Sequence, residues 1–94
     1  MRKEYDYLIV GSGLFGATFA NLAHAHGKQC LVIDKRPHLG GNVYCERIEG
    51  IIVHQYGPHI FHTSDEEVWG FVNSFVRFNH FTLNTIACYN GKLY

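Results

Sequence analysis

Apolar and small residues divide the first third of the chain into a strand, a helix and a second strand. Residues 5–10 are apolar on both faces, as expected of a parallel strand that helices cover. Residues 14–26 carry small or apolar positions suited to a helix packed on a sheet, and Gly27 follows as a stop signal. Residues 29–34 are again strand-like and end in Asp34. This order predicts one βαβ unit, in which a right-handed crossover joins two parallel strands.

The later part of the chain predicts two hairpins. Residues 43–46 and 51–54 are strand-like, and the turn at 47–50 joins them. Residues 82–89 alternate as a strand, and Asn90-Gly91 is typical of a two-residue hairpin turn. The return strand is then very short, so the sequence is expected to be the N-terminal part of a larger enzyme.

A second helix is predicted between these hairpins. Ser64 and Glu67 have the spacing of a capping box, in which each side chain bonds the other residue's backbone N–H. The residues that follow place one apolar face at helical spacing. These apolar positions are Val68, Phe71, Val72 and Phe75.

The turn between the first strand and the first helix has the sequence G-x-G-x-x-G, at residues 11–16. Gly11 permits a sharp turn, Gly13 lets backbone N–H groups approach a pyrophosphate, and Gly16 lets the helix pack closely on the sheet. The helix N-terminus then offers unpaired N–H groups and a partial positive charge to the phosphates. Asp34 stands where an acidic residue binds a ribose hydroxyl. Together these features predict a dinucleotide site.

Composition limits the partners that this chain is expected to have. Eight basic and eight acidic side chains cancel, which gives no indication of a nucleic acid or an anionic membrane as partner. No run approaches the roughly 18 apolar residues that a membrane span needs. The three cysteines are odd in number and lack C-x-x-C spacing, so we expect reduced thiols in a cytoplasmic protein.

The loop at residues 35–42 indicates which dinucleotide is bound. Arg36 is placed to reach a ribose or a phosphate, and Pro37 and the Gly40-Gly41 pair enforce a loop with unusual dihedral angles. A diglycine shortly after an acidic-x-Arg element resembles FAD-binding proteins of the glutathione-reductase and amine-oxidase type. A plain surface turn is the alternative.

A compact loop rich in aromatic residues and histidine follows the first hairpin, at residues 56–62. His54, His59 and His62 match no familiar zinc spacing, so no metal is predicted. The loop is instead a candidate for contact with the flat ring of a cofactor.

Taken together, these motifs resemble the UDP-galactopyranose mutase family over nearly the whole chain. The resemblance rests on residues 11–16, 34–36 and 40–42, and on the G-P-H-I-F-H-T loop at 57–63 followed by an acidic helix with Trp69. It implies FAD, a role in polysaccharide biosynthesis, and interconversion of UDP-galactopyranose and UDP-galactofuranose. In that chemistry the N5 atom of the reduced flavin forms a covalent adduct with the sugar.

The resemblance also implies site residues by position. It implies FAD contacts from Phe15, Asp34, Lys35, Asn42, His59 and Ile60. With the fingerprint glycines, Arg36 and Gly41 included, the predicted cofactor-binding set is Gly11, Gly13, Phe15, Gly16, Asp34, Lys35, Arg36, Gly41, Asn42, His59 and Ile60. No catalytic residue is assigned within the chain. Where the family tends to place a substrate-facing Asn, this sequence has Leu83, with Asn84 next to it, and a one-residue shift in a strand changes the face.

The fold class predicted is therefore α/β: a Rossmann-like βαβ FAD-binding unit with an added β-hairpin and helix. Residues 1–94 are expected to be the N-terminal part of a larger FAD-dependent fold, truncated before its sheet is complete. Two alternatives remain: an FAD-dependent oxidoreductase of the amine-oxidase type, and a piece with no activity of its own. Uncovered apolar faces also predict that the chain alone either self-associates or is marginally stable.

Overall fold

The computed structural model describes residues 2–94. The chain divides into two compact units, Met1–Ile60 and Phe61–Tyr94. The first unit contains β1 to β4, α1 and a short 3₁₀ helix, and the second contains α2 and the last two strands.

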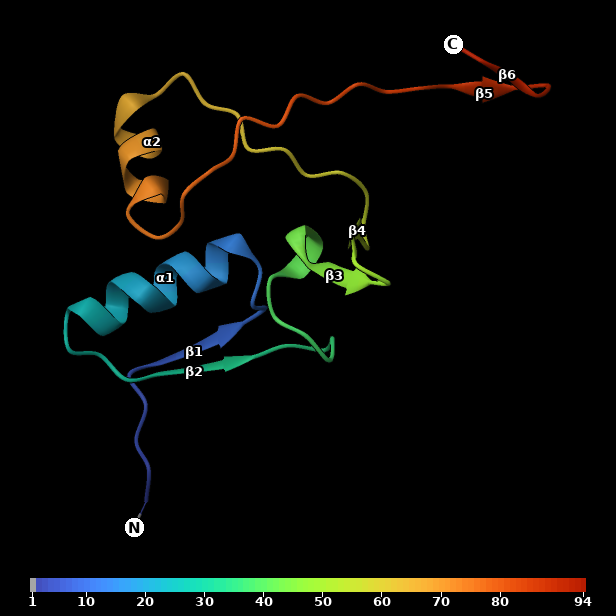
Figure 1. Cartoon of the computed structure of the whole chain (residues 1–94). Coiled ribbons are helices and arrows are strands. Elements are labelled where there is room, and N and C mark those ends of the chain that lie inside the picture. Colours follow the sequence, from blue (N-terminus) through green and yellow to red (C-terminus); the bar gives the residue numbers. More distant parts are fainter. Residues whose placement is uncertain (1) are drawn as a thin grey trace. The chain divides into compact units, whose positions relative to one another are not determined.

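The first unit begins with the predicted βαβ arrangement, which is confirmed. β1 (Tyr7–Val10) and β2 (Cys30–Ile33) pair in parallel, and α1 (Leu14–Ala25) connects them and packs on one face of the pair (Figure 1). β1 begins two residues later than the sequence predicted and ends where predicted, and β2 is one residue shorter at each end. The helix ends in a Schellman motif, because the Lys28 and Gly27 N–H groups donate to the carbonyl oxygens of Ala23 and His24 at 3.0 and 2.9 Å.

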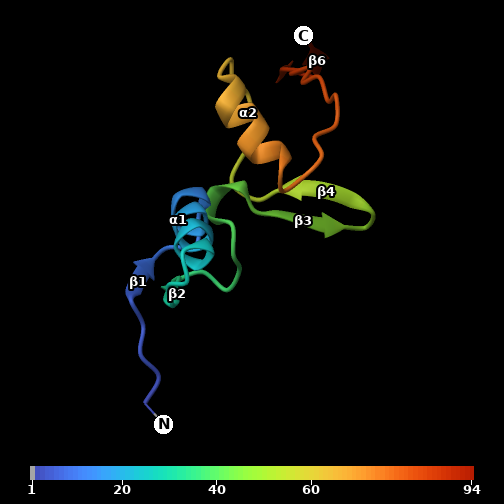
Figure 2. The same ribbon diagram turned by 90° about the vertical axis from the view of Figure 1, so that its left-hand side faces the viewer.

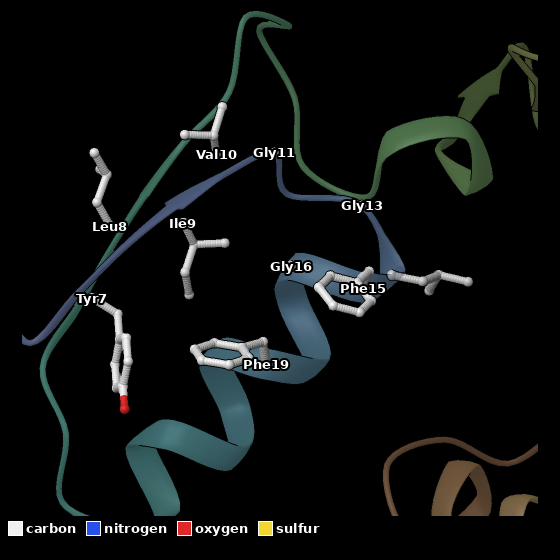
Figure 3. A pocket seen from close by; sticks show the side chains of 10 residues that line it. Tyr7, Leu8, Ile9, Val10, Gly11, Gly13, Phe15, Gly16 and Phe19 are labelled. Carbon is white, nitrogen blue, oxygen red and sulfur yellow. The ribbon is translucent and has the colours of Figure 1, made fainter.

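Side chains of β1 alternate between two faces of the sheet. Tyr7 and Ile9 point toward α1, where Tyr7 meets Phe19 edge to face at a centroid distance of 5.1 Å (Figure 3). Leu8 and Val10 point to the opposite face, and they are 62% and 78% exposed. One helix therefore covers one face, and the other apolar face of the strand pair is open.

A 3₁₀ helix, η1 (Gly41–Val43), precedes an antiparallel hairpin of β3 (Cys45–Ile48) and β4 (Ile51–His54), whose strands lie side by side in Figure 2. β3 starts two residues later than predicted, because residues 41–43 turn before the chain extends. The hairpin turn has only two residues, Glu49 and Gly50, both with positive φ.

In the second unit, α2 (Glu66–Asn73) begins with a different cap from the predicted one. Asp65, and not Ser64, is the N-cap, and its Oδ1 accepts the Glu67 and Val68 N–H groups at 2.9 and 3.1 Å. The predicted capping box is therefore wrong. A carboxylate one position closer to the helix reaches both of these N–H groups. Phe75 lies beyond the end of the helix.

The predicted strand at 82–89 is also wrong over most of its length. Only β5 (Cys88–Tyr89) and β6 (Lys92–Leu93) are strands, joined by the predicted Asn90-Gly91 turn. A strand requires hydrogen-bonded partners, and within 82–89 only Ala87, Cys88 and Tyr89 find them across the turn.

Apolar side chains remain open to solvent throughout the described residues. Between residues 2 and 94 no hydrophobic side chain is buried, and Ser12, at 4% exposed, is the buried polar residue. None of the described helices has both the length and the apolar content that crossing a membrane requires.

Candidate dinucleotide-binding site

The glycine turn holds the N-terminus of α1 at the carboxyl end of β1. Gly11 has φ of +102°, a conformation that side-chain-bearing residues rarely adopt, and its N–H donates to the Ile33 carbonyl oxygen at 2.7 Å. Gly13 is the N-cap of α1, and no side chain caps the helix there. The N–H groups of the first helical turn are thus left for an anionic ligand.

Gly16 sets how closely α1 approaches the turn. It is the buried residue of the helix, and a Cβ built on it would lie 2.1 Å from the Gly11 carbonyl oxygen and 3.1 Å from Cγ2 of Ile9. The contact with the Gly11 carbonyl oxygen is closer than real Cβ atoms come to other heavy atoms, so only glycine allows this packing. The prediction that Gly16 lets the helix pack closely matches this geometry.

Asp34 follows β2 and closes the site from the neighbouring strand. Its Oδ2 accepts the N–H and the hydroxyl of Ser12, each at 2.7 Å, and its Oδ1 accepts the Arg36 N–H at 2.8 Å. The Arg36 N–H, followed by the N–H and hydroxyl of Ser12, holds the pKa of Asp34 well below its usual range. The carboxylate is therefore ionised. It has about four lone-pair directions, of which three are used, so one is left for a ligand hydroxyl.

The Gly40-Gly41 loop lies directly against the glycine turn. The Gly40 N–H donates to the Ser12 carbonyl oxygen at 3.0 Å. Gly41 has φ of +59°, and a Cβ on it would lie 2.9 Å from Cα of Gly13. The diglycine therefore completes one wall of the turn.

The remaining predicted residues fall into three groups. Lys35 and Phe15 are exposed, with Phe15, at 87%, on the first turn of α1 (Figure 3). Arg36 and Asn42 bond to each other, from guanidinium Nη1 to amide Oδ1 at 2.9 Å. Ile60 is half exposed and His59 is exposed. No hydrogen bond within the described chain links these last two to the glycine turn.

His59 of the aromatic loop bonds to nearby protein atoms. Nδ1 of His59 donates to the Gly57 carbonyl oxygen at 2.8 Å, and the His59 N–H donates to Nδ1 of His54 at 3.4 Å. Across residues 2–94, no three histidine, cysteine or carboxylate side chains form a group that could hold a metal ion.

An apolar hollow of about 540 Å³ lies between β1 and α1 (Figure 3). Tyr7, Ile9 and Phe19 line it, together with the fingerprint glycines. Its apolar walls do not suit phosphates, which the open N–H groups at Gly13 attract instead.

Sequence reasoning missed Ser12 and Tyr56. Ser12 is one of the x positions of the G-x-G-x-x-G fingerprint, where the motif requires no particular residue. The sequence feature that could have revealed it is a small hydroxyl residue in the glycine turn, together with an acidic residue at the end of the second strand. Tyr56 lies under the Arg36 guanidinium, with Cζ of Arg36 4.1 Å from its ring centroid. Nothing local in the sequence pairs these two residues.

A βαβ unit with this glycine turn, an uncapped helix N-terminus and an ionised carboxylate after the second strand is a dinucleotide-binding unit of the Rossmann type. The chain belongs to the family of NAD(P)-binding Rossmann-like domains, which matches residues 9–75.

Several curated relatives carry the name of one kind of enzyme. The chain is 49% identical to dTDP-fucopyranose mutase of Escherichia coli over 93% of its own length and 24% of the relative. It is 41% and 38% identical to the UDP-galactopyranose mutases of Mycoplasma genitalium and Mycoplasma pneumoniae, over 84% of its length and 20% of each relative. These names confirm the resemblance found in the sequence. The chain spans about a fifth to a quarter of the length of these relatives.

Proposed function

We propose that this chain is the FAD-binding portion of a mutase that interconverts UDP-galactopyranose and UDP-galactofuranose. The observation that carries the proposal is the open N-terminus of α1 at Gly13, with the Gly40-Gly41 loop packed against it. Relatives named as pyranose mutases over most of the chain support the same assignment.

The chain's own residues fit the adenosine and pyrophosphate part of FAD. The first-turn N–H groups of α1 receive the pyrophosphate, whose charge the helix dipole stabilises. The remaining lone pair of Asp34 accepts a ribose hydroxyl, and the Asn42 amide donates to an oxygen of the cofactor. Phe15, Lys35 and the two residues of the aromatic loop, His59 and Ile60, complete the contacts.

The flavin part of the proposal concerns chemistry that the cofactor supplies. When bound and reduced, the flavin offers a nucleophilic nitrogen for covalent catalysis at the anomeric carbon of the sugar, with no net redox change. The residues of this chain bind and orient it. No residue of this chain is proposed as catalytic, and Leu83 offers no polar group to a substrate.

A second substrate has its own support. The relative named dTDP-fucopyranose mutase shares 49% identity, against 41% and 38% for the two UDP-galactopyranose mutases. The second candidate function is therefore interconversion of dTDP-fucopyranose with its furanose form. Both candidates are ring isomerisations of a nucleotide-linked sugar.

The first step of the test identifies the cofactor. The protein carrying this sequence is purified and denatured, and the released chromophore is identified by chromatography. The proposal predicts FAD at close to one equivalent, whereas a protein that holds no flavin would contradict it.

The second step separates the competing functions. The dithionite-reduced protein is incubated with UDP-galactopyranose or dTDP-fucopyranose, and the products are separated by anion-exchange chromatography. A furanose product from either sugar supports the mutase and identifies its substrate. Flavin reduction by an amine substrate with oxygen consumption, and no furanose, would instead support the amine-oxidase type of enzyme.

A further inference from the structure

Arg36 is held by contacts at three points of its length. Its N–H donates to Asp34, and its guanidinium Nη1 donates to Oδ1 of Asn42 at 2.9 Å. The guanidinium also lies over the ring of Tyr56, with Cζ 4.1 Å from the centroid. A planar guanidinium can stack on an aromatic face and still donate in its own plane, which an ammonium group cannot do.

Tyr56 is itself fixed from the other side. Its hydroxyl lies 2.7 Å from Nε2 of His38, and the His38 ring stacks on Tyr44 at 3.8 Å and 9°. Nδ1 of His38 lies 3.0 Å from the Leu39 carbonyl oxygen, which can only accept, so Nδ1 carries the proton in the neutral ring. In this tautomer Nε2 accepts a hydrogen bond from the hydroxyl of Tyr56. The aromatic ring beneath Arg36 is thus held in a single orientation.

These contacts determine which way the Asn42 amide is turned. Guanidinium nitrogen atoms only donate, so the atom of Asn42 that faces Arg36 is its oxygen. The amide nitrogen, with two donor hydrogens, is left for a different partner. Asn42 follows Gly41, whose backbone packs on Gly13 of the glycine turn. The free donors therefore belong to the loop that forms a wall of the dinucleotide site.

We propose that Arg36 is a positioning residue for the cofactor and makes no contact with it. Supported on Tyr56, it fixes the Asn42 amide so that Nδ2 donates to an acceptor oxygen of the bound dinucleotide. The inference rests on the proposed function, because FAD is the ligand in question. It replaces the direct contact between Arg36 and a ribose or phosphate that the sequence suggested.

The test is a double-mutant cycle on FAD affinity in the protein that carries this sequence. Cofactor-free wild type, Arg36→Met, Asn42→Ala and the double variant are titrated with FAD, and Kd is measured by flavin fluorescence. Each single variant is expected to weaken binding by about fivefold to tenfold, the range of one lost hydrogen bond. The double variant is expected to be no more than about twofold weaker than either single one.

Two further variants distinguish positioning from direct binding. Arg36→Lys is expected to weaken FAD as much as Arg36→Met, because an ammonium cannot both stack and donate in the plane. Tyr56→Leu is expected to reproduce the loss, whereas Tyr56→Phe keeps the supporting ring and most of the affinity. Thermal unfolding of each cofactor-free variant reports whether it folds. If Arg36→Met does not fold, a double-mutant cycle of Tyr56→Leu and Asn42→Ala takes the place of the cycle of Arg36→Met and Asn42→Ala.

Additive losses in the cycle, together with near wild-type binding by Arg36→Lys, would show that Arg36 contacts a cofactor phosphate and would overturn the inference. Failure of the proposed function gives a different result. In that case wild type itself would bind no FAD, and the positioning role would fall with it.

Discussion

Replacing Gly16 with Ala should destabilise the protein, although the same change usually stabilises a helix. An alanine in a helix interior is favoured over glycine by about 1 kcal/mol. At Gly16, however, the new Cβ would lie 2.1 Å from the Gly11 carbonyl oxygen. That separation is about 0.9 Å short of the closest approach that Cβ atoms make, so α1 or the turn must move.

The obstacle is backbone, which cannot rotate away as a side chain can. The Gly11 N–H bonds the Ile33 carbonyl oxygen at 2.7 Å, and this ties the turn to β2. Overpacking of this kind typically costs about 1–3 kcal/mol, and we expect the upper end of that range here. After the helix-propensity gain of about 1 kcal/mol is subtracted, the free energy of unfolding should fall by about 2 kcal/mol.

Gly70 provides the matched control, because it lies inside α2 and a Cβ built on it has nothing within 4 Å. Gly70→Ala should therefore raise the free energy of unfolding by up to about 1 kcal/mol. Urea unfolding of the cofactor-free proteins, followed by far-ultraviolet circular dichroism, measures both changes. If Gly16→Ala proved as stable as Gly70→Ala, the close packing of α1 on the turn would be refuted.

The other predictions concern acid stability, the diglycine loop and the exposed sheet. The lowered pKa of Asp34 stabilises the folded protein at pH values above the unfolded-state pKa of about 4, and this stabilisation is lost as the pH falls below that value. Asp34→Asn should therefore remove this part of the pH dependence of the free energy of unfolding, as acid unfolding curves can measure. An unchanged pH dependence would contradict the hydrogen-bonded carboxylate. Gly41→Ala should weaken FAD binding by at least about tenfold in a titration, because its Cβ would lie 2.9 Å from Gly13, and wild-type affinity would show that the loop does not form a wall of the site. The 94-residue chain alone should self-associate through the open face of β1 and β2 in sedimentation, whereas a monomer that melts cooperatively at high temperature would contradict this.

Local rules account for the part of the structure that sequence predicted well. The glycine turn, the helix stop and the acidic residue after the second strand each depend on a few neighbouring residues. Ser64 and Asp65 are competing caps one residue apart, and only the folded geometry selects the second. The alternation at 82–89 specifies a strand only if a partner strand is present. The contacts of Ser12 and Tyr56 join residues far apart in sequence, so no local pattern reveals them.

The central claim is that the glycine turn binds the pyrophosphate of FAD, and flavin occupancy of Gly13→Val tests it most directly. The protein itself leaves room at this position, since the nearest atom to a Cβ on Gly13 is Cα of Gly41 at 3.9 Å. The new side chain should therefore occupy the space of the pyrophosphate while the fold is kept, as circular dichroism can verify. We predict that wild type holds about one FAD and that the folded variant holds none. A folded Gly13→Val protein with full flavin occupancy would contradict the claim.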